Sequence, residues 1–240
     1  MGGGGITGSS AGETSKNANA SIEKCTAPLG TVAFYEDQHT DWYSILTRDY
    51  RLTSTIPVLR LLAQQTNCFV IVERGKMMSN MAQERALEAS GEIRKGSNFG
   101  KGQMVAADFT ISPEIFFSGA NTGGASGGVG AGKLGLVGAL LGGLSTKETQ
   151  TTLVLIENRS GVQIAAAVGQ ATSVDFFGAG SLFGSSAGGA LGAYTKTPEG
   201  KMIVNAFMDS MNQLIMALRE YKTQNVKGGL GKGGTLKVGN

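Results

Sequence analysis

The chain has few of the side chains from which most catalytic and metal sites are built. Its 240 residues include one histidine, two cysteines and one tryptophan. A zinc site needs three or four N, S or O ligands in fixed geometry, and His39 with the nearby Asp37 and Asp41 cannot supply a usual set. No Gly-x-Ser-x-Gly turn or similar nucleophile context appears. The sequence therefore predicts no metal, no other cofactor and no enzymatic activity.

Charge and long apolar runs are also scarce. The net charge is +3, which is too small for the basic field that nucleic-acid binding needs. No stretch reaches the ~18 continuous apolar residues of a membrane helix, and no charged-then-apolar secretory signal opens the chain. The run Gly127–Lys133 is similar to a phosphate-binding loop, but Leu134 follows where such a loop has Ser or Thr. Nucleic-acid and nucleotide binding are therefore not expected.

Glycine, by contrast, is abundant, with 38 residues against a usual share of ~7%. It is concentrated in the two ends and in two internal segments, 118–144 and 176–193. Residues 1–24 and 223–240 lack any apolar periodicity, so we expect disordered tails there. One domain over residues 25–222 remains.

The first half of this domain alternates strand and helix signals. Thr31–Tyr35 and Cys68–Val72 are runs rich in β-branched and aromatic residues, whereas Ile56–Gln65 and Met77–Ala89 have apolar residues at three- and four-residue spacing. This β-α-β-α order predicts an α/β fold with parallel strands and a right-handed crossover, in which both helices lie on the sheet.

The second half predicts β-hairpins and a final helix. A third strand covers 108–117, and Pro113 indicates that this strand is an edge there, or breaks there. Strands at 147–157 and 162–175 are joined by a turn at 158–161. Thr197 is a plausible N-cap for a last helix that opens at Pro198. With the glycine-rich segments, these strands form hairpin insertions at about 108–156 and 162–197.

Several of these stretches resemble the core of the CsgG/HfaB family. They are Phe69–Met78, which contains Glu73 and Arg74, then Gln83 with Glu84 and Arg85, and then Met104–Ser112. The family comprises the outer-membrane secretion component of curli assembly and its holdfast-anchor relatives. The resemblance extends from about residue 28 to 218. It implies a homo-oligomeric ring at the periplasmic face of the bacterial outer membrane, with a secreted or anchored protein as its partner.

The resemblance also implies roles for particular segments. A loop at 36–53 would line the narrowest part of the ring with Trp42, Tyr43 and Tyr50; alternatively, Trp42 and Tyr43 pin the loop onto the sheet. The glycine-rich hairpins would join those of other subunits in one transmembrane β-barrel, whose strands need ~9–11 residues with alternating apolar positions. Alternatively, they pack locally on a soluble periplasmic ring. The candidate membrane-facing residues are Leu134, Leu136, Leu140, Val162, Ile164, Val168 and Phe176.

The two cysteines bear on the compartment. Cys25 precedes the first strand and Cys68 begins the second, so parallel neighbouring strands would place both at one edge of the sheet. A disulfide is then geometrically plausible and would indicate an oxidising compartment; two unrelated buried thiols are the alternative.

The resemblance implies a lipidated N-terminal cysteine, so we expect Met1 to replace or truncate a signal peptide and lipobox. A cytoplasmic protein with a flexible start is the alternative.

The expected function is that of a secretion channel for an extracellular fibre or surface component. The alternative is a non-conducting periplasmic collar that anchors an appendage or binds peptidoglycan.

Overall fold

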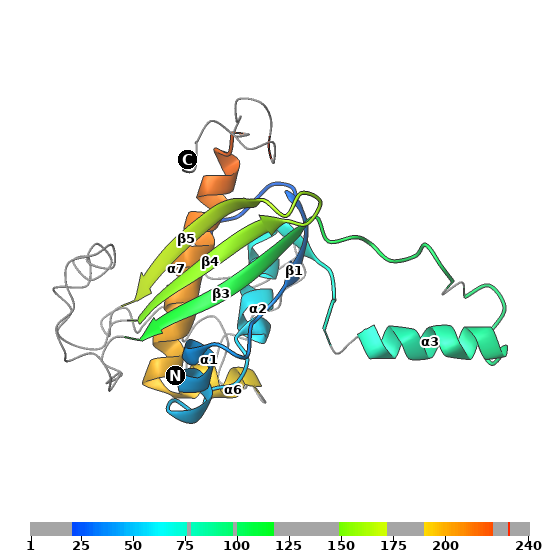
Figure 1. Ribbon diagram of the computed structural model, residues 1–240, viewed down its shortest axis with the longest axis horizontal. Helices are drawn as coiled ribbons and strands as arrows, with labels where there is room; N and C mark the ends of the chain where they lie inside the picture. Colours follow the sequence, from blue (N-terminus) through cyan, green and yellow to red (C-terminus); the bar gives the residue numbers. More distant parts are fainter. Residues whose placement is uncertain are drawn as a thin grey trace, which may run out of the picture.

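The computed structural model describes residues 21–75, 78–97, 100–117, 149–171, 190–222 and 230. Its elements follow one another as β1 (Gly30–Phe34), α1 (Asp41–Arg48), α2 (Ile56–Thr66), β2 (Phe69–Ile71), α3 (Met78–Ser90), β3 (Phe109–Phe117), β4 (Thr149–Glu157), β5 (Gln163–Ala171), α6 (Ala190–Lys196) and α7 (Pro198–Arg219) (Figure 1).

One five-stranded sheet runs through the domain in the order β2-β1-β3-β4-β5. β1 is parallel to β2, as the β-α-β order predicts, and it is also parallel to β3. The longer pairings, β3 with β4 and β4 with β5, are antiparallel, so the sheet as a whole is mixed and mostly antiparallel. The described strands of the predicted hairpins are therefore strands of the main sheet, whereas Ala190–Lys196, which the second hairpin was expected to include, form helix α6.

Pro113 lies where β3 loses one of its two neighbours. β1 ends at Phe34, opposite Ile111, and the Tyr35 N–H donates to the Ile111 carbonyl. Alternate residues of a strand direct their backbone groups to the same side, so Pro113 faces the side on which β1 has already ended. Its missing N–H removes no ladder hydrogen bond. The prediction of an edge at Pro113 is confirmed.

The core lies between the sheet and the helices α2 and α7, which cover one of its faces (Figure 1). Strand residues alternate between buried and partly or fully exposed along β3 and β4, as a sheet covered on one face requires. The largest fully buried side chains of this interface include Leu59, Leu62, Ile111, Leu153, Leu155, Ile203 and Phe207. Helix α7 begins as predicted, because the Thr197 hydroxyl accepts a hydrogen bond from the Gly200 N–H at 3.0 Å.

Helix α3 is where the structure differs most from the prediction. It forms over Met78–Ser90, but it projects away from the sheet and has no buried residue (Figure 1). The expectation that it lies on the sheet is wrong. Strand β2, which precedes α3, is only three residues long and is already in contact with α2. The apolar stripe of α3 consists mainly of alanines and two methionines. Such a stripe offers little area to bury.

Candidate functional site

The aromatic residues expected in a loop are carried by a helix instead. The prediction of an irregular loop over 36–53 is wrong for Asp41–Arg48, which form α1. Leu46 is completely buried and anchors this helix to the core. Trp42 and Tyr43 are half-buried against the core and contact each other edge to face, with ring centroids 5.7 Å apart. Both rings therefore have one part packed on the core and another part exposed, and their place at a constriction stays a prediction.

Tyr50 connects the α1 region to the end of β3. Its ring stacks on that of Phe117 with centroids 4.7 Å apart and an interplanar angle of 18°. Burial, followed by the charges of Glu199 and Asp49, raises the pKa of Tyr50. Phe117 is the last residue of β3, so the aromatic residues of this region lie near the end of the sheet where the first glycine-rich segment departs.

Both glycine-rich segments depart from that same end. Phe117 pairs with Thr149, and Thr149 pairs in turn with Ala171, the last residue of β5. Segment 118–148 therefore leaves and re-enters the sheet at adjacent positions, and segment 172–189 leaves beside it. The predicted membrane-facing residues Leu134, Leu136, Leu140 and Phe176 lie outside the described residues.

The three remaining membrane-facing candidates lie on the described hairpin. Val168 is 52% exposed on the sheet face opposite α7. Val162 lies in the turn at the far end of β5, away from the glycine-rich segments. Ile164 is an extra residue at a bulge, since Ile156 pairs with Gln163 while Leu155 pairs with Ala165. The bulge turns Ile164 toward the core, so the predicted alternation of one apolar face does not hold there.

The Glu73–Arg74 step forms the base of the arm, defined here as residues 75–105, which includes α3. The Glu73 carboxylate receives two contacts from the Arg60 guanidinium of α2, at 2.8 and 2.9 Å, and a hydrogen bond from the Gly75 N–H at 2.6 Å. Arg74 donates to the carbonyl of Val105 on the returning chain. One residue therefore fixes the departure of the arm and the next fixes its return.

The other two residues of the predicted motif lie on the arm itself. Arg85 donates to the Met104 sulfur at 3.7 Å, so α3 and the returning chain are in contact, whereas Glu84 is exposed. A hollow of about 250 Å³ opens at the base of the arm. Its lining includes Val72, Met78, Met81 and Met104. The motif is therefore divided between the base of the arm, which contains Glu73 and Arg74, and helix α3, which contains Glu84 and Arg85.

A second fastening holds the chain where it returns from the arm to β3. The Asp108 carboxylate accepts hydrogen bonds from the Thr31 backbone N–H at 3.0 Å and from the Thr31 hydroxyl at 2.9 Å, and Arg159 lies 3.2 Å away. The bonds from Thr31, followed by the charge of Arg159, lower the pKa of Asp108. The start of β3 is thereby tied to β1.

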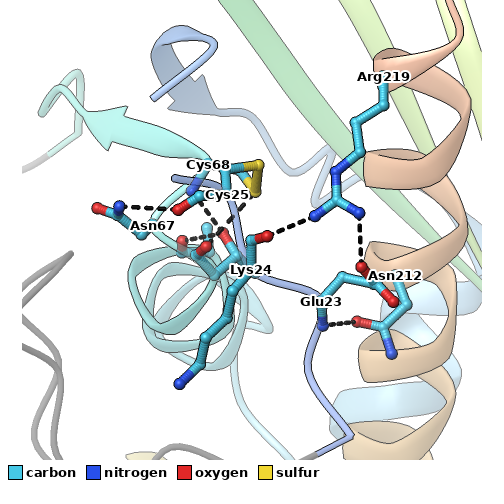
Figure 2. Close-up of a disulfide and its surroundings, with 9 residues drawn as sticks. Glu23, Lys24, Cys25, Asn67, Cys68, Asn212 and Arg219 are labelled. Atoms are coloured by element: carbon cyan, nitrogen blue, oxygen red, sulfur yellow. Dashed lines mark hydrogen bonds and ion pairs between the residues drawn. A yellow bond between two sulfur atoms is a disulfide. The ribbon is translucent and has the colours of Figure 1, made fainter. Parts of the chain in front are cut away.

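The N-terminal strap, defined here as residues 21–29, is fastened to α7 on one side (Figure 2). Asn212 accepts from the Glu23 N–H at 2.9 Å and donates to the Ser21 carbonyl at 2.7 Å. Arg219 forms an ion pair with the Glu23 carboxylate at 2.7 Å and also donates to the Lys24 carbonyl. Ile22 is 6% exposed and packs into the core, so residues 21–24 do not belong to the disordered tail that was expected through residue 24.

The other side of the strap is fastened to the junction between α2 and β2. Cys25 and Cys68 form a disulfide, with their Cα atoms 4.9 Å apart (Figure 2). The Cys25 N–H donates to the Thr66 carbonyl at 2.9 Å, and the Asn67 side chain donates to the Cys25 carbonyl at 3.0 Å. The strap therefore links α7 to the edge of the sheet.

Sequence reasoning missed the partners of these fastenings. Arg60 lies thirteen residues before Glu73, and Asn212 and Arg219 lie about 190 residues after the strap. Each is an ordinary polar residue on a helix, with no local pattern that marks it. Among the described residues, no cluster of three or more His, Cys, Asp or Glu could hold a metal ion, and no helix is long and apolar enough to cross a bilayer.

Comparison with known proteins identifies a family for this chain. A search of the curated proteins finds no match to the chain. A family model described as "Curli production assembly/transport component CsgG" matches residues 24–235, a span that runs from the strap through the whole sheet and past α7. The family is associated with the bacterial outer membrane, and its members are secretion and transport components, not enzymes. With most of its length matched, the chain belongs to the CsgG family of curli assembly and transport components.

Proposed function

We propose that identical copies of this chain assemble into a closed ring at the outer membrane, which passes a protein destined for an extracellular fibre or the cell surface. The observation that carries the proposal is that three strand ends lie side by side at one end of the sheet. They are Phe117 of β3, Thr149 of β4 and Ala171 of β5. Two glycine-rich segments start from this place, side by side. This is the connectivity that two neighbouring hairpins of a shared barrel require.

The bilayer wall of such a ring would come from the glycine-rich segments. Backbone groups in hydrocarbon must all be paired, and a closed barrel pairs them without leaving an edge. In the sequence, Leu134, Leu136 and Leu140 share one strand face, as a lipid-facing row does. One chain supplies too few strands to close a barrel, so the wall has to be shared among copies.

The passage would be narrowest near α1. Tyr50, two residues after the end of α1, stacks on Phe117 at the base of the first glycine-rich segment, which supports a narrow point close to α1. Trp42 and Tyr43 are only half-buried, so each keeps an exposed surface that a passing chain could contact. The opening would then be set by aromatic side chains held on a helix.

The compartment follows from the strap. A disulfide persists in an oxidising compartment such as the periplasm, and Cys25–Cys68 is therefore in keeping with a ring whose body lies on the periplasmic face.

Conductance across a planar bilayer tests the proposal. The purified oligomer should open channels, whereas a variant carrying Leu134→Ser, Leu136→Ser and Leu140→Ser should fail to insert. The matched control carries Val70→Ser and Met216→Ser, two exposed apolar positions on the body, and should conduct as the parent does. If the oligomer inserts into the bilayer and never conducts, the channel function is wrong and the anchoring collar is the function that remains.

A further inference from the structure

We propose that Cys25 is the sulfur through which the Cys25–Cys68 bridge is made and opened, and that its reaction partner is a dithiol protein, in its disulfide form when the bridge closes and in its reduced form when the bridge opens. This inference is independent of the secretion function. It rests on an asymmetry between the two cysteines, because Cys68 is 0% exposed whereas Cys25 is half-buried in a strap whose next residues, Thr26 to Leu29, are exposed.

The burial of Cys68 restricts the route of the exchange. Thiol–disulfide exchange requires the attacking thiolate to approach the target sulfur directly, so access decides which sulfur reacts. Cys68 lies immediately before β2, in the core cluster that includes Leu59 and Leu62 of α2. A second protein cannot reach it in the folded chain. Cys25 is the sulfur that such a partner can approach.

The strap also keeps Cys25 in place when the bridge is open. The Cys25 N–H and carbonyl are both bonded to the α2–β2 junction, through Thr66 and Asn67. Asn212 and Arg219 hold the preceding residues on α7. These fastenings do not involve sulfur, so the reduced chain would still present Cys25 to Cys68. Closure is then an intramolecular step at high effective concentration.

The reaction takes two exchanges. The Cys25 thiolate, having lost its proton to solvent, attacks one sulfur of the partner's disulfide, which forms a mixed disulfide and releases the partner's other sulfur as a thiolate. The Cys68 thiol then loses its proton and attacks the Cys25 sulfur. The mixed bond breaks, the Cys25–Cys68 bond forms, and the partner leaves as the dithiol with two electrons gained. Reduction follows the same path in reverse, with attack on Cys25.

Two single-cysteine variants of the full chain test the assignment. Cys68→Ser leaves Cys25, and Cys25→Ser leaves Cys68. With an aromatic disulfide reagent, 5,5′-dithiobis(2-nitrobenzoate), Cys25 should react ~100-fold or more faster than Cys68 under native conditions, since Cys68 must wait for local opening. In denaturant the two rates should coincide. Equal native rates, or a faster Cys68, would overturn the proposal.

The unmutated chain provides a second measurement if a variant does not fold. The reduced protein is pulsed with oxidised glutathione, quenched in acid and digested with trypsin. Glutathione should be found on the peptide from Cys25 to Arg48 and be scarce on the peptide from Leu61 to Arg74, which contains Cys68. The opposite distribution would contradict the assignment.

Asn67→Gly, which keeps the left-handed backbone of this residue but removes its bond to Cys25, should slow closure of the bridge. An unchanged closure rate would show that Asn67 does not hold Cys25 in place for closure.

Discussion

Arg60 holds Glu73 by two nitrogen–oxygen contacts of 2.8 and 2.9 Å, and the same carboxylate accepts the N–H of Gly75. The acid of the Glu73–Arg74 step therefore connects α2 to the first residues of the arm. Because α3 has no buried residue of its own, its direction depends on what is fixed at its base. The step has a positioning role in this chain.

Replacing Glu73 with Gln should loosen the arm. Both partners of the Arg60 ion pair are about one-third exposed, so the loss of global stability should be small, about 1 kcal/mol or less. The local effect should be larger, because the hydrogen bonds to Arg60 and Gly75 weaken together. Hydrogen exchange of residues 75–105 should speed up while that of α7 stays unchanged.

Arg48→Gln is the matched control for this experiment. Arg48 pairs with Asp49 at 2.7 Å, but both side chains are well exposed and lie away from the arm. Exchange in the arm should not respond to this change. If Glu73→Gln has as little effect on the arm as Arg48→Gln, the positioning role of Glu73 is wrong.

A methyl group at Gly169 should disrupt the contact between β5 and α7. A Cβ placed there would lie 2.1 Å from the Ala206 carbonyl oxygen and 2.3 Å from the Ser210 nitrogen, both of which belong to the helix backbone. Gly169→Ala should therefore lower the free energy of unfolding by about 3 kcal/mol, because the helix must move. Urea denaturation measures this. Val168→Ala, on the exposed face next to it, should cost far less; equal costs would contradict the close approach.

The sequence was sufficient for the elements whose signals are local. The spacing of apolar residues located α2, the hairpin and α7, because burial on one face imposes a period of two on strands and 3.6 on helices. The edge at Pro113 followed from the missing N–H, and the start of α7 from Thr197. These features depend on a few neighbouring residues.

The features that the sequence did not predict depend on distant contacts. Helix α3 has a helical pattern, but nothing in that pattern tells whether a sheet face is free to receive it. Helix α1 was hidden because its polar residues resemble those of a loop, although Leu46 is fully buried. The bulge at Ile164 changes which face it occupies, and a one-residue insertion leaves no mark on an Ala-rich strand.

Acid should weaken the fastening between Asp108 and Thr31. The pKa of Asp108 is lowered in the folded chain, so its contribution to stability is present above its unfolded pKa of ~3.9 and is lost as the pH falls through the folded value. Asp108→Asn should therefore be less stable than the parent at pH 7, and the gap should narrow at about pH 3 in urea titrations. Asp41→Asn, at an exposed position of α1, serves as the control. A gap of the same size at both pH values would contradict this role.

Alkali should act through Tyr194. Its side chain is 0% exposed and its hydroxyl donates to the Thr53 carbonyl. Burial, followed by the charge of Glu36, raises the pKa of Tyr194 far above its usual value. The unfolded chain loses this proton first, so stability should fall as the pH rises above ~10. Tyr194→Phe should lose part of this dependence in thermal melts, and an identical profile would be inconsistent with a buried phenol.

Loss of the disulfide should destabilise the domain through its unfolded state. The bridge spans a sequence separation of 43, for which the chain-entropy estimate is ~4 kcal/mol. Replacing both cysteines with serine should lower the melting temperature by about 10 °C, since ~1 kcal/mol shifts a domain of this size by 2–4 °C. A melting temperature within a degree or two of the parent would mean that the bridge does not constrain the unfolded chain.

The most direct test of the assembly is electron microscopy of the full chain purified in detergent. We expect closed rings of identical subunits. Replacing segment 118–148 with an Asn-Gly turn, which the pairing of Phe117 with Thr149 allows, should leave a folded domain that does not form the membrane-inserted ring. A full chain that stays monomeric at high concentration would contradict the account.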